Sequence, residues 1–225
     1  MKLKAIKKQS AEQLTVESLR DAITSGKLSP GTRITETELA DQFEVSRGTV
    51  RIALYQLMRE GIIDQTPYTG WAVTTLTPTD VWELYPLRAK LESLGAELAA
   101  QNIDDRGRAK LKCAYEALVA ACKDGERTNV ARADFELHRT IVELSGNARL
   151  ANHYHLIEQQ FRIFLLASTF THTDINGVVN EHMPIVEAIL TGDSKTAARL
   201  TEDHNMAGGA RLMKCIEDYN TQQQM

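Results

Sequence analysis

The sequence is poor in the residues that interrupt regular structure or cross-link secreted proteins. It has 5 prolines and 13 glycines in 225 residues, and its three cysteines, Cys113, Cys122 and Cys215, are scattered. An odd and scattered set makes no disulfide framework, so we expect reduced core thiols in a cytoplasmic protein. The scarcity of proline and glycine favours a largely helical chain.

Long apolar runs and a strong charge of one sign are absent too. No stretch of 18 apolar residues occurs, so we expect no membrane span, and the basic N-terminus lacks the apolar region of a secretory signal. The net charge of −4 argues against a protein that coats nucleic acid indiscriminately. Residues 1–75 carry a net charge of +1 and residues 76–225 carry −5, so contacts with phosphates are expected only in the first third.

A threonine-rich segment at 74–80 separates two different patterns, and we predict two domains, 1–77 and 78–225. The first domain shows three short helical patterns followed by a hairpin pattern. We expect helices at 11–25, from Thr35 and from Ser46, strands at 62–65 and 71–73, and a turn at 28–33. This order predicts a winged helix-turn-helix with a small β-hairpin wing.

The third helix of this domain has an exposed face that suits DNA. Its apolar residues follow helical spacing and are expected to be buried. Arg47, Thr49 and Arg51 then point outward near the N-terminal end of the helix, the part that enters a major groove. A solvated arginine pair on an ordinary amphipathic helix is the plainer interpretation, but the surrounding elements favour DNA binding.

Residues 78–225 show helical spacing and no strand pattern, which predicts an antiparallel α-helical bundle of six helices. The fold class predicted for the whole chain is therefore mainly α. Pro86 is expected to kink or break the first helix of the bundle. Gly208 and Gly209 are expected to weaken the middle of the last one.

Four residues of the bundle have the chemistry of metal ligands. Asp134 and His138 are four residues apart on an inward helix face, and His182 and His204 lie on later helices. One carboxylate and three imidazoles suit Zn²⁺, Ni²⁺ or Mn²⁺. From spacing alone, a hydrogen-bonded core histidine or a simple surface pair of Asp134 with His138 is the commoner outcome.

Two sets of motifs resemble a known family. P-G-T-R at 30–33, E-x-E-L-A at 36–40, V-S-R-x-x-V-R at 45–51 and Gly70 resemble the DNA-binding domain of GntR-type bacterial transcription regulators. L-R-x-x-L-E at 87–92, D-x-x-x-H at 134–138 and E-H-x-x-I-x-x-A-I at 181–189 resemble the FCD ligand-binding domain, in its shorter six-helix form. Three positions depart from the GntR pattern and affect the expected operator sequence: Thr37, Ile52 and Thr69.

The resemblance implies a homodimeric regulator, more often a repressor, that binds double-stranded operator DNA. The implied DNA-binding residues are Arg33, Thr37, Ser46, Arg47, Thr49, Arg51, Tyr68 and Gly70. It also implies a divalent metal on Asp134, His138, His182 and His204, with a small carboxylate effector completing the metal shell. Arg88 would face that carboxylate, and Arg162 is a weaker candidate for the same role.

Two other functions stay open at this point. An Asp/His₃ site with open positions can in principle activate water, which would make the protein a metalloenzyme. No spare carboxylate stands at motif spacing as a general base, and neither a nucleophile elbow nor a phosphate loop occurs. The second alternative is a regulator whose metal is purely structural. A buried Arg88 argues mildly against it, because a buried arginine requires an anion.

Overall fold

The computed structural model describes residues 10–66, 70–75, 77–167 and 175–223, with the side chains of 164–167, 176 and 215–223 excluded. The contacts divide the chain into two compact units. One holds the chain up to Thr75 together with Gln159–Ala167, and the other holds the rest. The predicted division at residue 77 stays a prediction, and each unit is described by itself.

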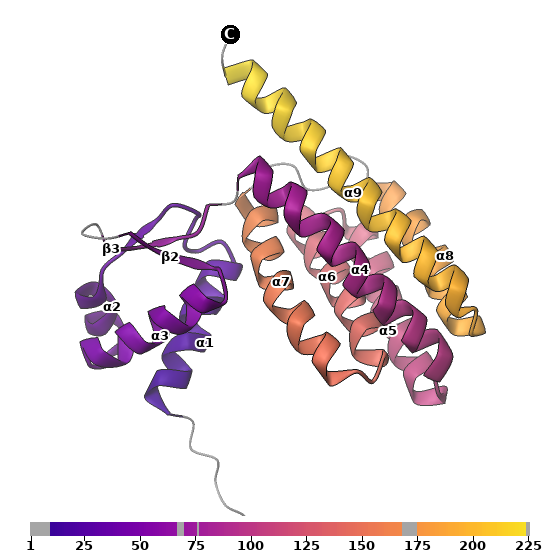
Figure 1. Cartoon of the computed structure of the whole chain (residues 1–225), viewed down its shortest axis with the longest axis horizontal. Coiled ribbons are helices and arrows are strands. Elements are labelled where there is room, and N and C mark those ends of the chain that lie inside the picture. Colours follow the sequence, from indigo (N-terminus) through magenta and orange to yellow (C-terminus); the bar gives the residue numbers. More distant parts are fainter. Residues whose placement is uncertain (1–9, 67–69, 76, 168–174, 224–225) are drawn as a thin grey trace, which may run out of the picture. The chain divides into compact units, whose positions relative to one another are not determined.

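Three whole helices and a small sheet, together with the segment Gln159–Ala167, form the first unit (Figure 1). The helices are α1 (Ala11–Thr24), α2 (Glu36–Phe43) and α3 (Arg47–Arg59). The hydroxyls of Ser10, Thr35 and Ser46 cap them by accepting from the backbone N–H three residues ahead. The chain turns between α2 and α3 at Glu44, which has a φ of 54°. The expected helix starts are therefore confirmed.

The sheet contains one more strand than expected. The predicted hairpin is present as β2 (Ile63–Thr66) and β3 (Gly70–Val73), and β1 (Arg33–Ile34) pairs with β3 on its other side, giving the order β1-β3-β2. All pairs are antiparallel, with Ile34 opposite Trp71 and Gln65 also opposite Trp71. A strand of two residues has no readable periodicity, so the sequence indicated only a turn there.

The core of this unit lies between the inner faces of the three helices and the sheet. Leu19, Val50, Ala53, Leu54 and Leu57 are all fully buried. The predicted apolar face of α3 is therefore confirmed, and the opposite face is left to solvent. Because the apolar face of α3 is buried, only the opposite face of this helix can contact a binding partner.

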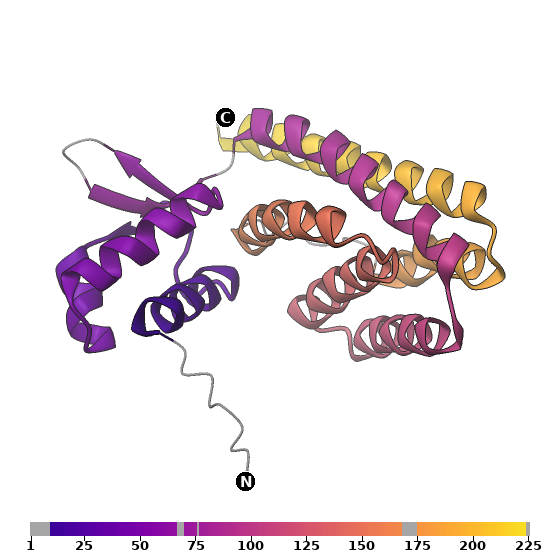
Figure 2. The ribbon, with the colours of Figure 1, turned by 60° about the horizontal axis from the view of Figure 1, so that its bottom comes forward.

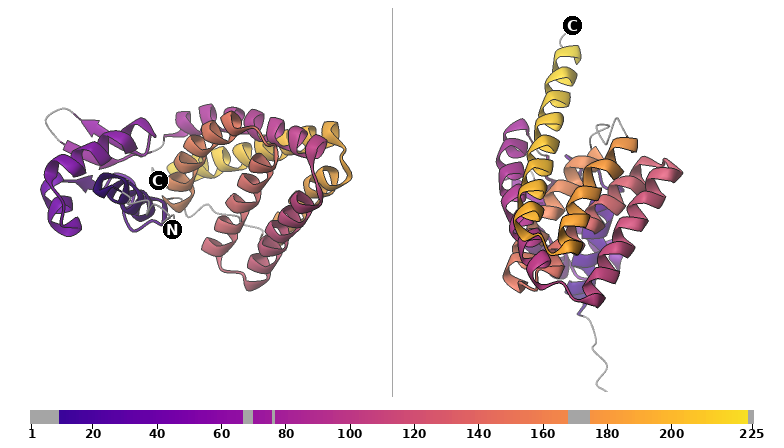
Figure 3. Two further views of the ribbon diagram at one scale, coloured as in Figure 1. Left: turned by 90° about the horizontal axis from the view of Figure 1, so that it is seen from below. Right: turned by 90° about the vertical axis from the view of Figure 1, so that its right-hand side faces the viewer.

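Six helices form the second unit: α4 (Pro78–Asn102), α5 (Asp105–Asp124), α6 (Arg127–Leu144), α7 (Ala148–Ala167, of which the first part belongs here), α8 (Ile175–Thr191) and α9 (Ser194–Gln223). α4 and α9 lie side by side and antiparallel, and the other helices pack on their inner side (Figure 2). Both views of Figure 3 show one helical bundle. The expected fold class and number of helices are confirmed for the described residues.

Neither expected interruption breaks its helix. α4 continues through Pro86, whose missing N–H removes one backbone hydrogen bond from a helix held by its packing on α6 and α9. α9 continues through Gly208 and Gly209. A Cβ on Gly209 would lie 2.7 Å from Tyr85 Cγ, so this glycine permits the close approach of α9 to α4.

Neither cysteine whose side chain the structure describes is fully buried in the core, where both were expected. Cys113 is exposed rather than in the core, Cys122 is partly buried, and the side chain of Cys215 lies outside the described residues. Among the described residues, no helix is both long and apolar enough to cross a membrane.

Candidate metal centre and nucleic-acid interface

The structure brings the four predicted metal ligands together inside the bundle. Asp134 and His138 come from α6, His182 from α8 and His204 from α9. His138 Nε2 lies 3.0 Å from His182 Nε2, and Asp134 Oδ1 lies 3.0 Å from His182 Nε2 and 3.8 Å from His138 Nε2. One ligand nitrogen from each histidine lies within 4.8 Å of the other two. Asp134, His138 and His182 are buried, and His204 is nearly so.

Polar contacts on the far sides of the rings orient two of the imidazoles. His182 Nδ1 lies 2.7 Å from the carbonyl oxygen of Val178, and His138 Nδ1 lies 2.7 Å from Glu92 Oε2. Both partners can only accept, so each Nδ1 carries the proton and each Nε2 keeps its lone pair. The two lone pairs and the Asp134 carboxylate therefore converge on one point.

Such a convergence of electron pairs is stable only around a positive charge. Ligands at about 2.0–2.1 Å from a tetrahedral zinc are spaced at roughly 3.3 Å, close to the separations found between these donors. The residues present thus fit a divalent cation. Without one, a proton shared by His182 and Asp134 can serve the same purpose.

The protonation of the histidines follows their neighbours. Burial lowers the pKa of His182, but the Asp134 carboxylate, together with the Val178 carbonyl and Glu181, outweighs burial and raises this pKa from its ordinary value. Burial lowers the pKa of His204 to about 4, despite its contact with Glu181 at 3.5 Å. His204 is therefore neutral at pH 7 and can offer a lone pair.

Glu92 is a central residue of this site that the sequence analysis missed. It is fully buried on α4, where Oε1 accepts from Arg88 Nε at 2.7 Å and Oε2 accepts from Asn205 Nδ2 at 2.7 Å. Burial raises the pKa of Glu92, but Arg88 and then His138 hold it below its ordinary value. The pairing of Glu92 with His138 is the carboxylate–histidine arrangement common beside metals.

The two arginines predicted to bind an effector have different surroundings. Arg88 is buried beside the cluster, pairs with Glu92 and lies with its guanidinium carbon 5.9 Å from the centre of the Phe135 ring. Its buried charge thus has an anion within the protein. Arg162 is half-buried on the part of α7 that belongs to the first unit. Its role as an effector ligand stays a prediction.

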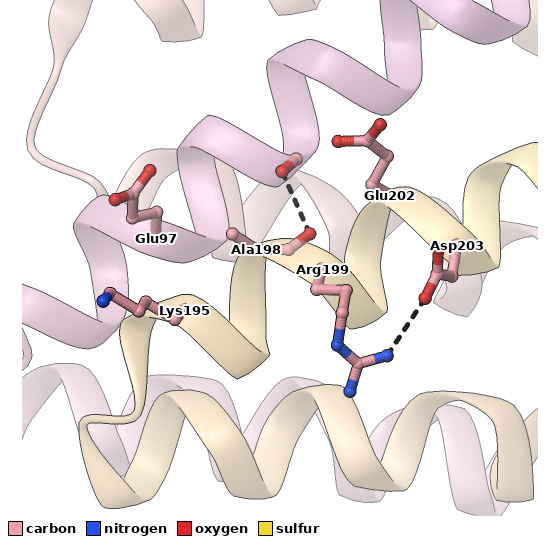
Figure 4. Close-up of a pocket in the computed structure, with 7 residues that line it drawn as sticks. Glu97, Lys195, Ala198, Arg199, Glu202 and Asp203 are labelled. Carbon is pink, nitrogen blue, oxygen red and sulfur yellow. Dashed lines mark hydrogen bonds and ion pairs between the residues drawn. The ribbon is translucent and has the colours of Figure 1, made fainter.

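A surface pocket of about 390 Å³ lies between α4 and α9 (Figure 4). Its charged residues have both signs, and Arg199 pairs with Asp203 at 3.1 Å while the Ser93 hydroxyl donates to the Ala198 carbonyl at 2.9 Å. None of the predicted metal or effector residues lines it. This pocket is therefore distinct from the candidate metal centre.

The predicted DNA-binding residues that the structure describes lie on the solvent side of the first unit. Arg33, Thr37, Ser46 and Arg47 are exposed, and Arg51 is half exposed. Thr49 is partly buried, and its hydroxyl is hydrogen-bonded to that of Ser46 at 2.9 Å. Gly70 starts β3 with a φ of 95°, a backbone conformation that favours glycine. Tyr68 and Thr69 lie outside the described residues.

Comparison with known proteins agrees with both parts of the structure. Residues 12–73 match the family described as bacterial regulatory proteins, gntR family, and residues 83–207 match the FCD domain. The uncharacterized HTH-type transcriptional regulator YdhC of Bacillus subtilis is 30% identical over 183 residues, 80% of each chain. The probable D-xylose utilization operon transcriptional repressor of Paenarthrobacter nicotinovorans is 28% identical over 182 residues, 81% of this chain and 80% of that one.

A solved structure shares the fold over nearly the whole length. E. coli McbR/YncC aligns with a TM-score of 0.80 at 18% identity, covering 93% of this chain and 100% of that one. The resemblance drawn from the sequence motifs is thus confirmed, and the matching families and relatives are transcription regulators, not enzymes. The chain belongs to the GntR family of bacterial transcription regulators, among the members that carry an FCD domain.

Proposed function

We propose that this regulator is a cytoplasmic repressor whose operator binding is controlled by a small carboxylate bound at a divalent metal in the bundle. The observation that carries the proposal is the convergence of two imidazole lone pairs and the Asp134 carboxylate beside His204. Repression is supported by the relative from Paenarthrobacter nicotinovorans, which is named as a probable transcriptional repressor.

The metal would be held by Asp134, His138, His182 and His204. Zn²⁺, Ni²⁺ and Mn²⁺ all accept a set of one carboxylate and three imidazoles. A bound metal would supply a Lewis-acidic centre for a carboxylate oxygen, by taking more ligands than these four. Glu92 keeps the proton on His138 Nδ1, and the Val178 carbonyl keeps the proton on His182 Nδ1. Both rings are therefore oriented for binding in the metal-free protein.

Arg88 would assist the effector as a second attraction. Its charge is already shared with Glu92 at 2.7 Å, so the metal, rather than Arg88, would provide most of the affinity for an anion. Arg162 keeps its place as the weaker candidate. The chemical class expected for the effector is a small mono- or dicarboxylate.

The DNA-binding part of the proposal assigns contacts to the exposed N-terminal end of α3 and to the wing. A homodimer would present two such surfaces to a pseudo-palindromic operator, because the two-fold symmetry of a dimer matches that of its half-sites. The proposed contacts come from Arg33, Thr37, Ser46, Arg47, Thr49, Arg51, Tyr68 and Gly70.

One observation favours a second candidate, in which the metal is structural and no small molecule binds. The predicted need of Arg88 for an external anion is removed by Glu92. In that case metal would raise the stability of the bundle without making DNA binding respond to carboxylates.

The deciding experiment measures metal content, and then operator release, for the wild type, His138→Ala and the control His153→Ala. His153 is exposed and lies on α7, so its loss should leave metal content unchanged. We expect about one divalent ion per chain in the wild type and the control, and none in His138→Ala. A panel of carboxylates added to metal-loaded protein on its operator then separates the two candidates. Absence of metal from the wild type after incubation with all three ions would refute both.

A further inference from the structure

A carboxylate lies among the cationic side chains that face DNA in the proposed interface. Glu36, in the first turn of α2, accepts through Oε1 from Arg51 Nε at 2.8 Å and from Trp71 Nε1 at 3.3 Å. Its Oε2 accepts from Arg51 Nη2 at 2.6 Å and lies 3.6 Å from Arg47 Nη2. Glu36 thus joins α2, the recognition helix α3 and the wing strand β3.

The exposures of these side chains differ in an informative way. The side chain of Glu36 is 14% exposed, whereas those of Arg47 and Arg51 are 63% and 51% exposed. A bond from Arg51 holds the pKa of Glu36 below its ordinary value, so the residue is charged at neutral pH. The carboxylate is therefore set behind the arginines, which stay accessible from solvent.

The bidentate bond fixes the orientation of Arg51. It occupies Nε and one hydrogen of Nη2, and a planar guanidinium held in this way directs its Nη1–Nη2 edge away from the carboxylate. That edge has the geometry to bind guanine or a phosphate. The side chain of Arg51 is already restricted in the free protein, so it loses less conformational entropy when DNA binds.

The same carboxylate weakens indiscriminate attraction. Binding without sequence preference depends on the positive charge that neutralises phosphates, and an arginine paired with a carboxylate contributes less to it. Glu36 therefore favours operator over other DNA in two ways. It orients Arg51 for a specific contact, and it reduces the positive charge that attracts any DNA.

We propose that Glu36 is a positioning residue that holds Arg51 for operator recognition and raises the preference for operator over other DNA. The proposal rests on the DNA-binding function proposed above. It assigns no DNA contact to Glu36 itself.

The test uses full-length protein and two DNA duplexes, one enriched from a random library by the wild type and one scrambled duplex of equal length. Glu36→Gln is compared with Asp41→Asn, which removes the same charge from an exposed position on α2. Dissociation constants for both duplexes are measured by fluorescence anisotropy at two salt concentrations. Thermal unfolding checks that each variant is folded.

We expect Glu36→Gln to weaken binding of the enriched duplex but not of the scrambled duplex. The enriched duplex should bind about tenfold more weakly, and the scrambled duplex as tightly as or more tightly than it binds the wild type, so the ratio of the two constants falls by about tenfold or more. Asp41→Asn should shift both constants in the same direction and keep the ratio. In an Arg51→Ala background, Glu36→Gln should no longer change the ratio.

Three outcomes overturn the inference. If Glu36→Gln tightens both duplexes by one factor, Glu36 contributes charge alone. If it weakens both equally together with a lower unfolding temperature, Glu36 is only structural. If the wild type enriches no duplex, the DNA-binding proposal fails first and this inference with it.

Discussion

Replacing Glu92 with glutamine should disturb the candidate metal centre although Glu92 is not a ligand. Glutamine has one carbonyl oxygen where Glu92 has two acceptors, so its amide must face either Arg88 Nε or the Asn205 amide. Asn205 cannot turn round without giving up its bond to the Thr201 carbonyl. Arg88 can only donate, so the glutamine oxygen stays on Arg88 and the amide faces Asn205 and His138. His138 Nδ1 must then accept a hydrogen bond, and its proton moves to Nε2, where the metal would bind.

Two magnitudes follow from this arrangement. Removing one partner of a buried ion pair costs about 3–5 kcal/mol, which for a chain of this size corresponds to a fall on the order of 10 °C in unfolding temperature. Loss of the carboxylate behind a metal-bound histidine lowers metal affinity by about 10- to 100-fold. Both effects should exceed those of Glu83→Gln, the same change at an exposed position of α4.

The assay combines thermal unfolding in chelator with zinc competition against a chromophoric chelator at pH 7, at a temperature where both variants are folded. Zinc affinity in Glu92→Gln equal to that in Glu83→Gln would refute the tautomer argument. A lower unfolding temperature with unchanged zinc affinity would leave Glu92 as a structural partner of Arg88 only.

Further predictions concern packing, metal and pH. Gly209→Ala should lower stability by roughly 1–3 kcal/mol through its clash with Tyr85, whereas Gly208→Ala, whose Cβ would lie at an ordinary 3.6 Å from Tyr85, should raise it by up to about 1 kcal/mol; urea unfolding compares the two. Saturating zinc at about 100 times its dissociation constant should stabilise the protein by about 2.7 kcal/mol, and calorimetry should find no such gain in His138→Ala. The pKa of Glu36 is lowered from 4.5, so its stabilisation is fully present above pH 4.5 and is lost below it; the difference in unfolding temperature between the wild type and Glu36→Gln should therefore shrink between pH 6 and pH 3.

Local features of the fold were readable from the sequence because they depend on neighbouring residues. The caps at Thr35 and Ser46 each involve residues three apart, and the inward face that carries Asp134 and His138 follows from a spacing of four. The sequence did not predict strand β1, because a strand of two residues shows no periodicity. Pro86 was expected to kink or break α4, and the break does not occur, because local propensity is overruled by packing on neighbouring helices.

The partners of the candidate site were harder to predict, because they depend on how the helices approach one another. Glu92 lies 113 positions from Asn205 in the sequence, and no local pattern indicates that the two side chains bond. Glu36 and Trp71 are similarly distant, 35 positions apart. Such contacts are set by tertiary packing, which periodicity and capping signals do not encode.

Arg88 shows that the anion required by a buried arginine can come from the protein itself. A buried arginine does require an anion, and that rule favoured an effector carboxylate. The anion is four residues further along the same helix, a spacing at which opposite charges meet. Under the proposed function, most of the affinity for a carboxylate effector would then come from the metal, since the charge of Arg88 is already paired with Glu92. Replacing Arg88 by alanine would leave the buried Glu92 without its arginine partner and disturb His138 through it. A loss of effector response in that variant is therefore not by itself evidence that Arg88 touches the effector.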